Sequence, residues 1–247
     1  MIEPLESRIA PAAIVSFTET DGDKITVQTS KGTQAQLEDA LNITKGATGI
    51  DGFTLDLIES PALASAFAGT SVTINAVKTG AGDGLAGHVK INASKGGADD
   101  IDLAKVTIRG NLVSINVGDA ETLTKALKSL VVTNVIQDKG NPDAVASLIQ
   151  GDIGKVHVAK DFNGFFASRD PITSPRGTVI NSFYAGAIAR EVGNDVGHLQ
   201  VSEINNLTVV KRIEGATGFT NNGAIEATAI GKMSIGGMSS FAKIILS

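Results

Sequence analysis

Residues 103–108 read L-A-K-V-T-I, and residues 153–158 read I-G-K-V-H-V. Both follow one order of residue types: apolar, small, basic, apolar, polar, apolar. Further copies, one of them looser, are A-G-H-V-K-I (86–91), L-K-S-L-V-V (127–132), V-G-H-L-Q-V (196–201) and I-G-K-M-S-I (230–235). Successive copies begin 17, 24, 26, 43 and 34 residues apart, and degraded copies near Val179–Ala185 and Ile213 divide the wider gaps.

The fourth and sixth positions of this repeat are apolar and mostly β-branched. Side chains alternate along a strand with a period of two, so both positions lie on one face, which we expect to point inward. Stacked units of 20 or more residues are typical of solenoids. The repeat therefore predicts an all-β fold, a parallel β-helix (β-solenoid) with irregular coils of about 17–26 residues. The fourth position holds Val89, Val106, Leu130, Val156, Leu199 and Met233.

Three regions follow from this prediction. Residues 1–13 form an N-terminal segment, a candidate export or assembly arm. Residues 14–80 form a hairpin and cap region, because Asp21-Gly22 divides two alternating runs within Ile14–Lys31. Residues 81–247 carry the solenoid repeats. We also expect weak helices or irregular structure at 33–43 and 57–67, a strand at 71–77, and short helices at 119–127 and 142–150.

The composition excludes several classes of protein. The 247 residues include no Cys, no Trp and one Tyr, and the net charge is −5. An acidic chain lacks the electrostatic footprint of a nucleic-acid-binding protein. No apolar run is long enough to span a membrane. The scarcity of aromatic residues favours a narrow interior filled by aliphatic side chains.

No catalytic, cofactor-binding or metal site is expected, and the chain is predicted not to be an enzyme. The run G-D-G-L-A-G (82–87) matches a dinucleotide fingerprint, but a strand follows it where that motif requires a helix. The histidines His88, His157 and His198 are expected on the outer surface, with His88 and His198 too far apart to share a metal ion.

Two acidic groups leave a Ca²⁺ site open. Asp21 and Asp23 flank a glycine, and Asp99, Asp100 and Asp102 form the densest acidic cluster. Carboxylate oxygens are the ligands that Ca²⁺ takes. Asp-Gly favours a turn in the first case, and a solvated loop is the simpler interpretation of the second.

The third column of the repeat is mostly basic, which is unusual in an acidic protein. An anionic surface glycan is one partner for such a stripe, and a solvated lysine-rich face is the alternative. Neither the third nor the fifth column contains Asp or Glu, which disfavours a polysaccharide-cleaving site on this face. The third column holds His88, Lys105, Ser129, Lys155, His198 and Lys232.

Several of these segments resemble one group of proteins. The opening L-E-S-R-I-A-P-A (5–12), the hairpin at 15–32 and the repeats together resemble bacterial exported β-helix repeat proteins of the cell surface, most of them uncharacterised. The resemblance implies a β-solenoid and an extracellular or cell-surface location. It implies no established activity.

The ends of the predicted solenoid suggest its function. A solenoid exposes strand edges and apolar core at an end that has no cap. Residues 239–247 (S-S-F-A-K-I-I-L-S) are apolar and contain no polar capping helix. The sequence predicts a structural protein whose copies stack head-to-tail into a fibre or layer. The alternative is a glycan-binding or polysaccharide-cleaving β-helix. The expected assembly interface is Ile9, Ile14, Val15, Phe241, Ile244, Ile245 and Leu246.

Overall fold

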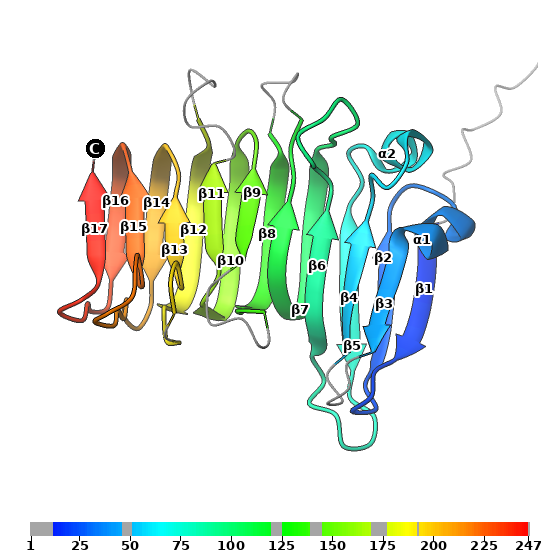
Figure 1. The fold of residues 1–247 in the computed structure, drawn as a ribbon, viewed down its shortest axis with the longest axis horizontal. Helices are drawn as coiled ribbons and strands as arrows, with labels where there is room; N and C mark the ends of the chain where they lie inside the picture. The colour runs from blue at the N-terminus through cyan, green and yellow to red at the C-terminus, as the bar shows by residue number, and fades with distance from the viewer. Residues whose placement is uncertain are drawn as a thin grey trace, which may run out of the picture.

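The computed structural model describes residues 12–45, 51–119, 125–138, 145–168, 177–191 and 193–246. Most of these residues are in β-strands, which lie side by side in one stack from the N-terminal to the C-terminal end of the molecule (Figure 1). The strands form a twelve-stranded mixed sheet and a five-stranded parallel sheet, and neither sheet closes on itself within the described ranges. The expectation of a mainly β chain is confirmed.

The large sheet contains β1 (Ala13–Thr18), β2 (Lys24–Thr29), β3 (Leu41–Lys45), β4 (Asp51–Asp56), β5 (Val72–Val77), β6 (Ala86–Asn92), β7 (Leu103–Asn116), β8 (Leu127–Val135), β10 (Ile153–Phe162), β12 (Val179–Ile188), β14 (Glu203–Val209) and β16 (Ala229–Ile235). The small sheet contains β9 (Ala146–Ile149), β11 (Phe165–Ser168), β13 (His198–Gln200), β15 (Ala224–Ala227) and β17 (Lys243–Leu246). The helices α1 (Gln34–Ala40) and α2 (Pro61–Phe67) are seven residues each.

The N-terminal part of the large sheet is antiparallel and branched. β1 and β2 form the predicted hairpin, and Gly22 in its turn has a φ of 97°, a conformation that suits glycine. β2 pairs with β5, and the first half of β7 continues this branch. The second half of β7 pairs with β6, which leads through β4 to β3. The long β7 therefore joins two branches to the rest of the sheet.

From β8 onward the chain alternates between the two sheets, one strand in each. Parallel pairing brings equivalent positions of the large-sheet strands into register, at intervals of 24, 26, 27, 24 and 26 residues. These intervals replace the uneven spacing expected from the sequence. The first positions in register are Leu103, Leu127, Ile153, Ile180, Ile204 and Ile230.

Two of the predicted repeat copies do not belong to this series. The copy at 86–91 forms β6, which pairs beside the second half of β7. The copy at 196–201 contributes β13 to the small sheet, and the copy in register is instead 204–209. The degraded copy near Val179–Ala185 is genuine and forms part of β12. The same order of residue types suits a half-buried strand in either sheet, so the pattern alone does not distinguish them.

The core lies between inward columns of these strands. Val106, Leu130, Val156, Phe183 and Leu207 occupy one column and are all almost fully buried. Aliphatic side chains fill most of this core, and several of the nine phenylalanines pack among them. Phe162 packs edge-on against Phe166 and Phe183 at ring-centroid distances of 5.0 and 5.3 Å.

The helix predictions had mixed results. α1 and α2 lie within the segments 33–43 and 57–67, and Thr33 and Ser60 cap their N-termini. The helix expected at 142–150 is wrong, because residues 146–149 form β9 of the small sheet. Most of the helix expected at 119–127 lies outside the described residues, and its last residue begins β8.

Candidate functional site: the two ends of the sheets

The C-terminal end of the stack consists of two open strand edges. Within the described residues, β16 pairs only with β14, and β17 pairs only with β15. The outer backbone groups of both strands are therefore available to another strand. An open edge of this kind is a template for pairing with a further chain.

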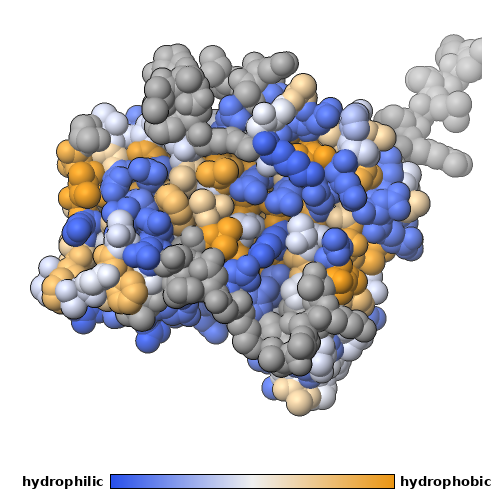
Figure 2. All heavy atoms as spheres, in the orientation of Figure 1, coloured by the Kyte–Doolittle hydropathy of each residue, from blue (hydrophilic) through white to orange (hydrophobic). Residues whose placement is uncertain are grey.

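The inward columns of the core become exposed at this end. Leu207 in β14 is 1% exposed, whereas Met233, its partner in β16, is 55% exposed. In a second column, Ile213 is buried and its bridge partner Met238 is exposed. In a third, Ala227 in β15 is buried and its partner in β17, Leu246, is 62% exposed. Three separate columns thus end in exposed apolar side chains. Hydrophobic side chains also gather at this end of the molecule, on the left of Figure 2.

We refer to these residues as the C-terminal face: Ile230, Met233, Ile235, Met238, Phe241, Ile244, Ile245 and Leu246. The predicted interface residues Phe241, Ile245 and Leu246 are exposed here, and Ile244 is half-buried. The exposed side chains of Met233 and Met238 were not singled out in the sequence analysis. The signal for Met233 was present, since it occupies the inward fourth position of a repeat copy, and no other described strand of the large sheet covers that copy on its outer edge.

A hollow of about 270 Å³ adjoins this face. Two exposed aromatic rings, Phe219 and Phe241, lie on its wall with the polar side chains of Ser240 and Lys243. The hollow is formed by the turns before β15 and β17, so it belongs to the same end of the stack. The C-terminal end of the stack is therefore hollowed as well as hydrophobic.

At the N-terminal end, β1 and β3 each pair with one strand only among the described residues, and α1 packs against both. Ile14 on β1 and Ile43 on β3 are exposed, and Val15 is half-buried. Phe17 packs edge-on against Phe53 with ring centroids 5.3 Å apart. The predicted interface residue Ile9 lies outside the described residues. Within one molecule, Ile14 and Val15 lie at the opposite end of the stack from the C-terminal face (Figure 1).

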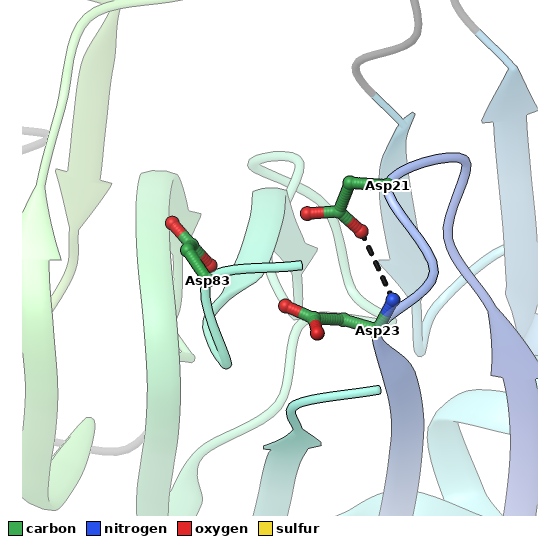
Figure 3. Close-up of side chains that lie close together, drawn as sticks. All are labelled: Asp21, Asp23 and Asp83. Carbon is green, nitrogen blue, oxygen red and sulfur yellow. Dashed lines mark hydrogen bonds between the residues drawn. The ribbon is translucent and has the colours of Figure 1, made fainter. Parts of the chain in front are cut away.

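Asp21 and Asp23 in the first hairpin turn meet Asp83 from the loop before β6 (Figure 3). Carboxylate oxygens of the three residues lie within 4.8 Å of one another. The Asp23 carboxylate accepts hydrogen bonds from the backbone N–H of Gly84 at 2.6 Å and of Thr79 at 3.2 Å. Asp21 accepts one from the Asp23 N–H at 3.0 Å. This geometry ties the hairpin to the loop 79–84.

The second acidic group does not form one cluster of carboxylates in the described part of the chain. The Asp100 carboxylate accepts hydrogen bonds from the Ser94 hydroxyl and the Lys95 N–H. The Asp102 carboxylate instead accepts one from the Asp119 N–H. Asp100 therefore organises its own loop, whereas Asp102 connects the residues before β7 to those after it.

The expectation that all three histidines lie on the surface is wrong for His198. This ring is 1% exposed and stacks on Phe165 at 4.6 Å. Its Nδ1 lies 3.1 Å from an Asp195 carboxylate oxygen, and its Nε2 lies 3.5 Å from a Glu226 oxygen. Burial lowers the pKa of His198, while the two carboxylates act in the opposite direction. The turn that carries Asp195 and the neighbouring strand β15 cover the ring.

His157 and His88 are half-buried. The His157 ring stacks on Tyr184 from the next strand at 4.4 Å, and burial followed by the Lys155 charge lowers the pKa of His157. His88 lies beside Gly52 and Asn111, outside the third column of the in-register repeats. The three imidazoles are not brought together.

No family model, curated protein sequence or solved structure matches this chain. Neither described helix is long and apolar enough to cross a membrane. The site is therefore interpreted from its own geometry.

Proposed function

We propose that the chain is a structural, cell-surface or extracellular protein with a β-solenoid fold, whose copies assemble end-to-end into a fibre or layer. The regular alternation of strands between two sheets, at intervals of 24–27 residues, supports the solenoid. The single observation that carries the assembly is the C-terminal face, where three core columns end in exposed apolar side chains beside open strand edges.

A second copy fits this face for two reasons. First, β1 is antiparallel to β2, β2 is antiparallel to β5, and β5 is parallel to β7, so β1 has the same direction as β16. An incoming β1 can therefore continue the sheet as a parallel strand. Second, the two strands are six and seven residues long and are similar in length.

The energetics favour covering the C-terminal face. Burying one large apolar side chain contributes about 1.5–3 kcal/mol, and five such side chains are exposed on this face. Strand addition at an open edge also supplies backbone hydrogen bonds. The two ends present different surfaces, so the contact is heterologous, and a heterologous contact that does not close produces a filament.

Two charge substitutions test the two ends separately. Met233→Lys places a charge on the C-terminal face, where burial without a partner costs several kcal/mol. Val15→Lys places a charge on the inward side of β1, which would face the core columns of the preceding copy. Val210→Lys is the matched control, since Val210 is 52% exposed and follows β14, one strand in from the C-terminal edge of the large sheet.

We expect wild type and V210K to form polymers in sedimentation velocity and negative-stain electron microscopy. M233K and V15K should each need about 100-fold more protein to assemble. A mixture of M233K and V15K should form dimers only, because each variant retains one competent end. A wild-type chain that stays monomeric at high concentration, or equal assembly by M233K and V210K, would refute the proposal.

A further inference from the structure

Two outward columns of the large sheet contain no carboxylate across six neighbouring strands. They are the third and fifth columns of the in-register repeat on β7, β8, β10, β12, β14 and β16. None of these residues is Asp or Glu, although the chain contains 26 acidic and 21 basic residues. The third column is Lys105, Ser129, Lys155, Ser182, Asn206 and Lys232, and the fifth is Thr107, Val131, His157, Tyr184, Thr208 and Ser234.

This surface, which we call the outer face, carries three positive charges in its third column. Lys105, Lys155 and Lys232 are exposed. One strand separates Lys105 from Lys155, which places their backbones about 10 Å apart. The two acidic residues within these six strands are Asp161 near the end of β10, which pairs with Arg190 at 3.2 Å, and Glu203 at the start of β14. Further exposed basic residues on these strands or directly after them are Arg109, Lys128, Lys160, Lys211 and Arg212.

The neutral positions between the charges are mostly hydroxyls and one amide. Side chains of this kind donate and accept hydrogen bonds, which suits the hydroxyl groups of a sugar. The one tyrosine of the chain, Tyr184, has a ring face covered by His157 at 4.4 Å. The outer face therefore lacks the open aromatic rings on which the bases of a single-stranded nucleic acid stack.

We propose that the outer face binds a linear polysaccharide that carries carboxylate groups. The carboxylates lie against Lys105, Lys155 and Lys232, and the sugar hydroxyls lie against the serine, threonine and asparagine side chains between them. The inference is independent of end-to-end assembly, because the face is present on every single copy. In an assembled stack the same face would continue from copy to copy.

Binding to polygalacturonate, with uncharged dextran as the reference polymer, tests this inference. The variant Lys105→Gln with Lys155→Gln removes two charges from the outer face. Its matched control, Lys31→Gln with Lys95→Gln, removes two exposed lysines from two loops, so both variants have the same net charge. Measurements on the M233K background separate binding from assembly.

We expect wild-type protein to bind polygalacturonate at low salt, to release it as salt rises, and to ignore dextran. K105Q/K155Q should bind about tenfold more weakly, and K31Q/K95Q should bind like wild type. Three results would overturn the inference: no binding to polygalacturonate at low salt, equal losses in the two double variants, or equally tight binding to single-stranded DNA.

Discussion

Met233 lies beside Leu207 in parallel register, yet Met233 is 55% exposed and Leu207 is 1% exposed. The two side chains occupy one column of the core, and they differ only in whether another strand covers them. Every side chain in the column is apolar, so the last one, Met233, is suited to burial but is not buried. The surface that results is the feature on which the proposed assembly rests.

This pair gives a direct test of the fold. Leu207→Ala removes buried atoms and leaves a cavity, so we expect the free energy of unfolding to fall by about 2–4 kcal/mol. Met233→Ala removes exposed atoms and should change it by less than about 0.5 kcal/mol. Urea denaturation, at protein concentrations where the chain is monomeric, measures both. Equal losses in the two variants would contradict the placement of β16 at the end of the stack.

Asp23 should be important for the stability of the N-terminal hairpin. Asp23→Ala removes the acceptor of the Gly84 and Thr79 N–H groups, and hydrogen bonds to a charged group contribute about 1.5–3 kcal/mol each. We expect a loss of about 2–3 kcal/mol in thermal or urea unfolding, because the exposed loop regains part of this from water. Asp21→Ala, which removes an acceptor for one N–H only, is the control and should lose less.

The same residues allow a test for Ca²⁺. A bound ion stabilises the folded state in proportion to the logarithm of its concentration. A Tm that rises with added Ca²⁺ in wild type, and stays constant in Asp83→Ala, would identify the Asp21, Asp23 and Asp83 carboxylates as a cation site. An unchanged Tm in both proteins would show that these carboxylates bind no Ca²⁺ and serve only the loop contacts described above.

His198 should make stability depend on pH. Burial lowers its pKa in the folded state, so below its ordinary value of 6.5 the unfolded chain takes up a proton first. The free energy of unfolding contributed by this group is therefore present above pH 6.5 and decreases as the pH falls. Glu191, whose pKa is raised by burial and by Asp161, acts in the opposite direction.

A comparison with His157 tests the contribution of His198 to this pH dependence. His198→Gln should flatten the decrease between about pH 6.5 and pH 5, while His157→Gln should change it less because His157 is half-exposed. Urea unfolding at several pH values measures the slopes. The same slope in H198Q and wild type would show that His198 is not the group responsible.

The sequence predicted the inward columns well where the repeat is regular. Leu103, Leu127 and Ile153 begin copies that do lie in register, and Asp21-Gly22 does form the turn of a hairpin. These features depend on alternation and on turn residues, which are local properties of the chain. Phe183 and Ala185 occupy the same columns but break the expected pattern, because any apolar side chain of suitable volume fills the space.

The candidate site was predicted in part. The sequence pointed to the C-terminal strand and to Ile14, which are exposed at opposite ends of the stack, but not to Met238 or Ile43. Met238 continues the column of Ile188 and Ile213, and from the end of β12 onward this column is joined only by isolated bridges. No sequence periodicity marks a column of that kind.

The sequence by itself determined that this protein is built from half-buried strands, where the first hairpin turns, and which side chains face inward within each regular strand. These properties follow from local alternation and turn chemistry. Only the tertiary structure decided which strand lies beside which, that residues 196–201 belong to the small sheet and 204–209 to the large one, and that His198 is buried beside two carboxylates. Strands pair through backbone groups that are the same in every residue, so the choice of neighbour is made by packing between distant segments and not by the local sequence.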